Sequence, residues 1–90
     1  MKTVRIIIKG FVQGVFYRQS TLKKAEELGI KGTVRNCEDE TVEIIAMGTK
    51  EQIDALISWC WQGPPRSKVS NVTVQELSLQ PFNNFSIIRH

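Results

Sequence analysis

The sequence predicts one α+β domain in which two helices cover one face of a mostly antiparallel sheet. The chain has 90 residues, of which 41% are hydrophobic and 23% are charged, and these are ordinary values for a globular protein. This length leaves no room for two domains of typical size. Segments with strand and helix periodicity alternate along it, without internal repeats or linkers. We therefore expect a single domain over residues 1–90.

The N-terminal part predicts a strand, a loop and a helix. β-Branched residues alternate with basic ones over residues 3–10, which is typical of a strand. A loop from Gly10 to Tyr17 leads into a helix over Arg18–Leu28, and Gly29 is suited to end it. The apolar side of this helix comprises Leu22, Ala25 and Leu28.

A hairpin is expected next. Two strand-like segments, Lys31–Cys37 and Thr41–Gly48, flank the polar turn Glu38-Asp39-Glu40. Alternation of Val42, Ile44 and Ala46 with their neighbours gives the second strand two distinct faces.

The C-terminal part predicts a helix and two strands. Thr49 and Gln52 fit a capping box, and Gly63-Pro64-Pro65 ends the helix. The apolar face has helical spacing and comprises Ile53, Leu56, Ile57, Cys60 and Trp61. Trp59 cannot share a face with Trp61, two residues away, and we expect it to be exposed. Strands are expected over residues 68–79 and Phe85–Arg89.

The predicted element order is βαββαβ followed by a short C-terminal strand. This is the order of the ferredoxin-like split-βαβ sandwich. Right-handed crossovers place both helices on one face of the sheet.

Charge and composition exclude several functional classes. The formal net charge is 12 − 9 = +3, but the basic residues are scattered, which favours a mixed solvated surface over a nucleic-acid-binding face. Cys37, Cys60 and His90 are too few for a disulfide framework or a structural zinc site. Arg5 and Lys9 interrupt the first apolar stretch, so it is no signal peptide. We expect a cytoplasmic protein without a metal, cofactor or membrane partner.

The loop from Gly10 to Arg18 is the most informative segment for function. The first amides of a helix have no internal partner and attract negative charge. Successive loop amides can form a nest for an anion, and Arg18 adds a permanently charged guanidinium. These features suit a phosphate-sized dianion. A plain connection, with glycines that satisfy turn geometry and a solvated Arg18, fits the spacing as well. Asn36, at the end of the next strand, is by itself more typical of a turn residue.

The motifs taken together are more specific. Residues Val12-Gln13-Gly14-Val15-Phe16-Tyr17-Arg18 resemble the signature loop of the acylphosphatase family, V-Q-G-V-x-F-R. Residues 32–36, Gly-Thr-Val-Arg-Asn, resemble its second motif, G-x-V-x-N. Later segments resemble the family in the same order, namely Val42-Glu43, Gly63-Pro64-Pro65 with Val69, and the closing Phe85…Ile87…Arg89. The resemblance covers nearly the whole chain.

The resemblance implies hydrolysis of the carboxyl-phosphate bond of acyl phosphates, without metal or cofactor. It implies that Arg18 binds the phosphoryl group and that Asn36 positions the attacking water. The backbone amides implied in phosphate binding are those of Gln13, Gly14, Val15, Phe16, Tyr17 and Arg18. The implied partners are small acyl phosphates and inorganic phosphate, and a monomer is the default expectation.

The sequence departs from the family pattern at a few positions. Tyr17 replaces the usual Phe before the arginine, and Ser67 stands where many members have Ala. Asp39-Glu40 replaces the usual Asp-Gly, which leaves the geometry of the hairpin turn open because Glu tolerates positive φ poorly.

Two features in and beside the motifs, a group of four apolar residues and one cysteine, have more than one interpretation. Phe11, Val15, Phe16 and Tyr17 could form an apolar ring around the phosphate, although packing of Val15 and Tyr17 beneath the loop is favoured. Cys37 adjoins Asn36 and could make the site sensitive to oxidation, although an ordinary strand cysteine is favoured.

The chemistry is feasible with so few groups. The acyl part of an acyl phosphate leaves as a carboxylate whose conjugate acid has a pKa of about 4, so no general acid is needed.

Two other functions stay open. Lys9-Gly10-Phe11 resembles the start of an RNA-recognition motif, but the stacking aromatics expected on central strands are missing. The second is a phosphate-binding or regulatory domain without catalytic activity.

Overall fold

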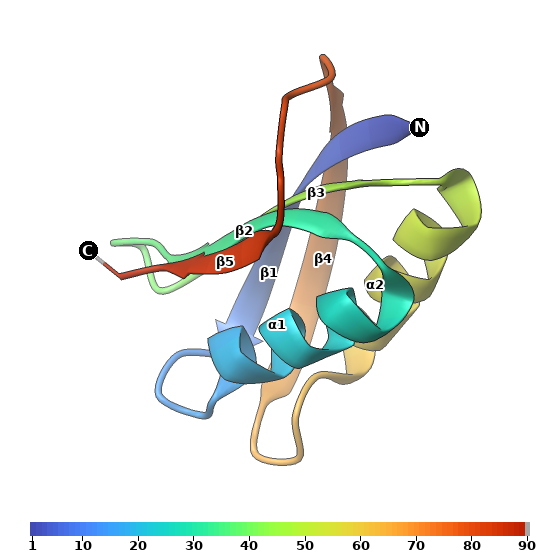
Figure 1. Ribbon diagram of the computed structural model, residues 1–90. Coiled ribbons are helices and arrows are strands. Elements are labelled where there is room, and N and C mark those ends of the chain that lie inside the picture. The colour runs from blue at the N-terminus through green and yellow to red at the C-terminus, as the bar shows by residue number, and fades with distance from the viewer. Residues whose placement is uncertain (90) are drawn as a thin grey trace.

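The computed structural model describes residues 1–89 and contains a five-stranded sheet with two helices on one face (Figure 1). The elements are β1 (Lys2–Phe11), α1 (Tyr17–Leu28), β2 (Lys31–Asn36), β3 (Val42–Gly48), α2 (Lys50–Gln62), β4 (Lys68–Leu77) and β5 (Phe85–Ile88). The predicted ferredoxin-like fold is confirmed, and the predicted strand and first-helix boundaries differ by one or two residues. No helix within residues 1–89 is long and apolar enough to cross a membrane.

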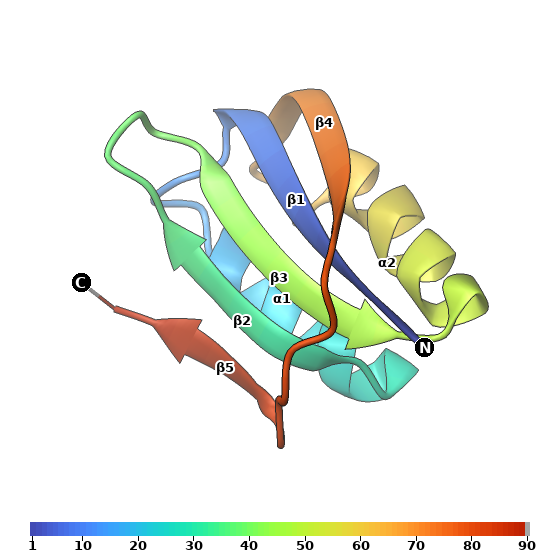
Figure 2. The same ribbon diagram turned by 90° about the horizontal axis from the view of Figure 1, so that it is seen from above.

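The sheet has the strand order β4-β1-β3-β2-β5. All neighbouring strands are antiparallel except β2 and β5, which are parallel and place Arg35 opposite Ile88. The connection from β4 to β5 crosses the face of the sheet opposite the helices, which brings the last strand beside β2 (Figure 2). The ends of β2 and β5 therefore lie next to each other, at the same end of the sheet as the loop after β1.

The core lies between the sheet and the helices. Alternate residues of the central strands face it, so that Ile6 and Ile44 are paired across β1 and β3 and are fully buried. Both helices contribute fully buried residues, which are Thr21, Ala25, Ile53, Leu56 and Cys60. The Thr21 hydroxyl is satisfied because it donates to the Tyr17 carbonyl at 2.8 Å.

The prediction for the two tryptophans of α2 is wrong. Trp61 is 49% exposed, whereas Trp59 packs against the core, with its ring centroid 5.4 Å from that of Tyr17. The reason is that α2 packs against α1 as well as the sheet, which extends its buried face toward Trp59. Ile57 is only partly buried on the opposite flank.

The β2–β3 turn keeps a left-handed residue despite the absence of glycine. Glu40 itself adopts φ 69°. Backbone bonds from Cys37 N to Thr41 O (2.9 Å) and from Glu40 N to Cys37 O (3.2 Å) close the turn. Asp39 accepts hydrogen bonds from the Thr41 hydroxyl and amide, which lowers its pKa. The turn is therefore regular, with a left-handed non-glycine residue that costs about 1–2 kcal/mol.

Candidate active site

The loop between β1 and α1 contains two left-handed residues. Gly14 has φ 75° and Phe16, the residue before the helix, has φ 65°. A positive φ is uncommon for a bulky residue such as Phe. Alternation of left-handed and ordinary residues turns successive amides toward one side, as in an anion-binding nest.

The amides of this loop are not used by the fold. The first amide of the helix region with an internal partner is Ser20 N, which donates to Phe16 O at 3.0 Å. Within residues 1–89, the amides of residues 13–19 donate no hydrogen bond to another residue. The helix also has no side-chain N-cap. The positive end of α1 and a run of free donors therefore face the same region.

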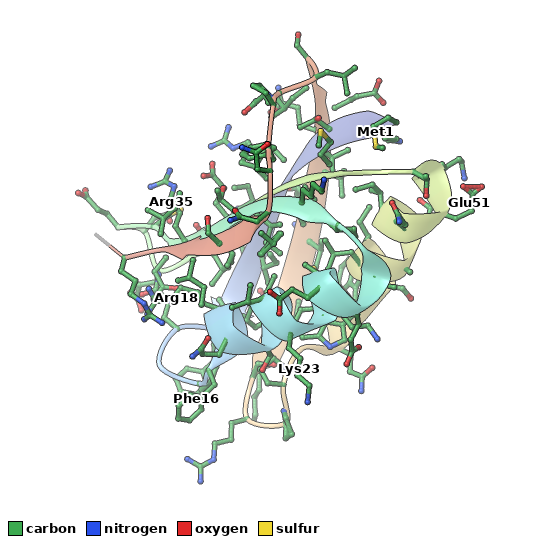
Figure 3. All side chains as sticks on the ribbon, in the orientation of Figure 1. Met1, Phe16, Arg18, Lys23, Arg35 and Glu51 are labelled. Atoms are coloured by element: carbon green, nitrogen blue, oxygen red, sulfur yellow. The ribbon has the colours of Figure 1, made fainter. Side chains whose placement is uncertain are left out.

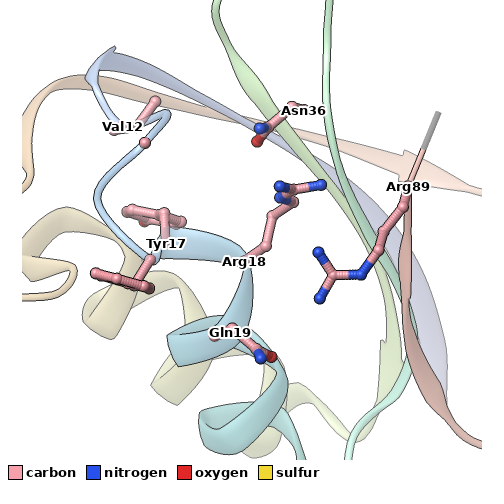
Figure 4. Close-up of a pocket in the computed structure, with 8 residues that line it drawn as sticks. Val12, Tyr17, Arg18, Gln19, Asn36 and Arg89 are labelled. Atoms are coloured by element: carbon pink, nitrogen blue, oxygen red, sulfur yellow. The ribbon is translucent and has the colours of Figure 1, made fainter.

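A cavity of about 330 Å³ lies in front of this loop (Figure 4). Its lining residues are Val12, Gly14, Phe16, Tyr17, Arg18, Gln19, Asn36 and Arg89. The structure thus brings Arg18, from the first turn of α1, together with Asn36, from the last residue of β2. No carboxylate is among these described lining residues, so the cavity is positively charged.

The Asn36 side chain has an unused acceptor. Its Oδ1 atom is buried and accepts no hydrogen bond from the described residues. Buried polar atoms in proteins are rarely left without a partner, and exceptions are often found at functional sites. The backbone of Asn36 is held in place because it pairs with Val42 in the sheet.

Gln13 connects the loop to the β2–β3 turn. Its side-chain amide donates to the Cys37 carbonyl and to the Thr41 carbonyl, each at 2.9 Å. These bonds fix the loop relative to the end of β2, where Asn36 lies. The sequence predicted only a backbone role for Gln13, because nothing in its local pattern indicates a partner 24 or 28 residues away.

Comparison with known proteins identifies the family. The family model named Acylphosphatase matches residues 4–87. The chain belongs to the acylphosphatase family. It is 44% identical over 90 residues to the acylphosphatase of Methylococcus capsulatus, covering 99% of this chain and 98% of that protein. It is 50% identical over 86 residues to the acylphosphatase of Acaryochloris marina, covering 96% and 92%.

Solved acylphosphatase structures share the whole fold. The structure from Bacillus subtilis has a TM-score of 0.96 at 36% identity and covers 99% of this chain and 100% of that one. The structure from Coxiella burnetii has a TM-score of 0.94 at 39% identity and covers 97% and 92%. The same fold also occurs in full-length HypF, at 28% identity and a TM-score of 0.91, but there it matches only 12% of that chain.

The aromatic residues of the acylphosphatase loop have separate roles. Val15 and Tyr17 are buried beneath it, which confirms the favoured interpretation of these two residues. Phe16, which Figure 3 labels beside the loop, is 72% exposed, and Phe11 is 60% exposed. These two residues therefore do not form a closed apolar ring around the cavity. Phe16 still lines one wall of the cavity.

Tyr17, which departs from the family motif, uses its hydroxyl inside the core. The hydroxyl donates to the Cys60 carbonyl at 2.7 Å. Burial is the largest cause that raises the pKa of Tyr17, and the neighbouring Cys60 side chain raises it further. Burial likewise raises the pKa of the Cys60 thiol to about 12. Neither group is ionised near neutral pH, and both act as packing groups.

Arg89 is a cavity residue that the sequence did not single out for the site. It follows β5 directly, and the parallel pairing of β5 with β2 places it next to Asn36. Its guanidinium points into the cavity toward Arg18 (Figure 4). Only the register of a parallel pair of strands could have revealed this position, because Asn36 and Arg89 lie far apart in the sequence.

The described residues contain no cluster of three or more His, Cys, Asp or Glu side chains that could hold a metal ion. His90, the single histidine of the sequence, lies outside the described residues.

Proposed function

We propose that this protein hydrolyses acyl phosphates, with Arg18 and the loop amides binding the phosphoryl group and Asn36 positioning the attacking water. The observation that carries the proposal is one cavity that holds Arg18, Asn36 and the free amides at the start of α1. Membership of the acylphosphatase family supports the same reaction.

Phosphoryl binding follows from charge and geometry. The planar Arg18 guanidinium can donate two parallel hydrogen bonds to phosphoryl oxygens. The amides of residues 13–18 supply neutral donors from the opposite side, and the dipole of α1 adds partial positive charge. This site matches three equatorial oxygens that share negative charge, which is the charge distribution of the transition state in phosphoryl transfer.

The Asn36 carboxamide suits a water-positioning role because it has both a donor and an acceptor. Its acceptor atom has no partner among the described residues, and the residue lines the same cavity as Arg18. In the proposed step, the water oxygen bonds to phosphorus while the bond from phosphorus to the acyl oxygen breaks. The electron pair leaves with the carboxylate, and a phosphoryl oxygen takes the proton of the water.

The reaction needs no acidic side chain, because the carboxylate leaving group is stable without protonation. The described lining residues include no carboxylate that would repel the phosphoryl dianion. Positioning and charge stabilisation are then sufficient, as in phosphoryl transfer generally.

An assay in EDTA tests the proposal, with benzoyl phosphate and phenyl phosphate as parallel substrates. We expect hydrolysis of benzoyl phosphate only, because phenolate is a far poorer leaving group than benzoate and would need an acid. Inorganic phosphate should inhibit competitively. Phosphate binding without hydrolysis would instead indicate a catalytically silent module, and salt-dependent binding of single-stranded RNA would indicate the RNA-binding alternative.

A further inference from the structure

The cavity contains one guanidinium more than phosphoryl binding requires. Arg18 lies at the start of α1, beside the loop amides, and is the group assigned to the phosphoryl oxygens. Arg89 enters the same cavity from β5, on the side of Arg18 that faces away from the loop (Figure 4). A substrate bound at the loop would meet the Arg89 guanidinium where its acyl part extends past Arg18.

The charge of Arg89 is not neutralised by the part of the chain that the structure describes. The ion pairs within residues 1–89 involve Lys2, Arg5, Lys24, Arg35 and Lys50, and neither cavity arginine is among them. No carboxylate lines the cavity in this range. A guanidinium that lines a cavity without an acidic neighbour is suited to bind an anion from solution.

We propose that Arg89 recognises a second negative charge on the acyl group, so that the site favours acyl phosphates whose acyl part is itself anionic. This inference rests on the proposed function, and it adds the chemical class of the substrate. The recognised group is a carboxylate or a phosphate, since both match the planar fork of arginine.

The test measures a specificity ratio on three substrates that differ only at the para position of the ring. These are benzoyl phosphate, 4-carboxybenzoyl phosphate and 4-carbamoylbenzoyl phosphate, of which the last is a neutral isostere of the second. The ratio is kcat/KM for the substituted substrate divided by kcat/KM for benzoyl phosphate. We expect the ratio for the carboxylated substrate to fall about tenfold in Arg89→Gln, the value of one charge-assisted hydrogen bond in a partly exposed site.

Two controls make the result specific. The ratio for the carbamoyl substrate should stay the same in Arg89→Gln, because that substrate has no charge to lose. Arg66→Gln removes an exposed arginine outside the cavity and should change neither ratio.

An unchanged carboxylate ratio in Arg89→Gln would overturn the inference, including the case in which turnover of all three substrates falls equally. Equal falls would assign Arg89 to the phosphoryl group and leave the proposed function intact. If the unmodified protein failed to hydrolyse benzoyl phosphate at all, the proposed function would be contradicted as well.

Discussion

Two pairs of arginines on this small protein differ in what neutralises them. On the open face of the sheet, Arg5 and Arg35 each place Nε 2.7 Å from a carboxylate oxygen of Glu43. In the cavity, Arg18 and Arg89 have no carboxylate neighbour among the described residues. The first pair joins strands through a shared carboxylate, and the second has no such partner within residues 1–89. The partner of an arginine, rather than the residue type, therefore separates a group paired within the fold from one that we propose binds a ligand.

The open-face group is stable because one carboxylate serves two strands. Glu43 lies on β3, between Arg5 on β1 and Arg35 on β2, and its side chain is 11% exposed. Burial opposes ionisation, but the hydrogen bonds from Arg35 and Arg5 outweigh it and lower the pKa of Glu43. Removal of the Glu43 carboxylate would leave the positive charges of Arg5 and Arg35 without a partner. Arg18 and Arg89 in the cavity are already in that state, and in our proposal a bound anion neutralises them.

The largest expected effect is on turnover, in Arg18→Ala. Loss of one preorganised donor costs about 2.7–4 kcal/mol of transition-state stabilisation, a fall of roughly 100- to 1,000-fold in kcat/KM. Phosphate inhibition should disappear with it. The matched control is Arg35→Ala, which should lower stability and leave kcat/KM within about twofold, since it lies outside the cavity. Equal losses of turnover in Arg18→Ala and Arg35→Ala would show that the cavity arginines and the open-face arginines do not differ in function.

The next effect is expected in Asn36→Ala. We expect kcat to fall roughly 100-fold, the lower end of the range for a single transition-state donor. The inhibition constant for inorganic phosphate should change little, because the amides and Arg18 remain. Asn71→Ala, an exposed position on β4, is the control. Unchanged turnover in the Asn36 variant would remove this residue from the mechanism.

A smaller effect is expected in Gln13→Ala, which cuts both bonds from the loop to the β2–β3 turn. The loop and Asn36 would then no longer be held in register. Each such bond contributes about 1 kcal/mol, so we expect kcat to fall about tenfold. The positioning role is tested by the phosphate inhibition constant, which should stay within twofold while kcat falls. A proportional loss of both would indicate a collapsed loop, and Gln75→Ala on β4 is the control.

Local patterns predicted much of the molecule from the sequence. Strand alternation over residues 3–10 predicted β1, in which Val4, Ile6 and Ile8 are buried, and the capping box at Thr49 was confirmed with both of its bonds. The loop and Asn36, which line one cavity, could be singled out as candidates because their motifs are contiguous. These features depend on residues within about one turn of helix or one strand.

The remaining features depend on how distant segments pack. Trp59 is partly buried because α1 lies beside it, and the helical pattern alone favoured Trp61. Gln13 and Arg89 reach the site through contacts with the β2–β3 turn and with β2, which no periodicity encodes. A polar side chain with an ordinary neighbourhood in sequence can thus have a specific role that only the strand register reveals.

A stability effect is expected in Glu43→Gln. Charge-assisted hydrogen bonds contribute about 1.5–3 kcal/mol, and both arginines are partly exposed, so we expect a loss of about 1–2 kcal/mol at pH 7. The folded-state pKa of Glu43 lies below its unfolded value of about 4.3. The stabilisation is therefore complete above that value and is lost as pH falls through the folded-state pKa.

Urea unfolding of the wild type and Glu43→Gln at pH 7, 5 and 3 checks this prediction. The difference in unfolding free energy between the two proteins should be constant from pH 7 to 5 and should shrink toward pH 3. Glu38→Gln, an exposed position without an ion pair among the described residues, should show no such dependence. If the difference in unfolding free energy is as large at pH 3 as at pH 7, the stability lost in Glu43→Gln would come from changed side-chain packing and not from the lost charge.

The smallest effect is expected in Tyr17→Phe, which restores the family motif and bears on how the loop is supported from below. The hydroxyl bonds to the Cys60 carbonyl near the end of α2, so it joins the first residue of one helix to the last turn of the other. Its removal should cost about 1 kcal/mol, because the carbonyl is left with one donor fewer while the ring continues to pack against Trp59. A loss of that size lowers the melting temperature by roughly 4–8 °C in a domain of this length. The hydroxyl points into the core and the free amides are unaffected, so kcat/KM for benzoyl phosphate should stay within twofold. A tenfold change in turnover at unchanged stability would mean that the hydroxyl shapes the phosphate loop, and that the family's usual Phe is a functional choice.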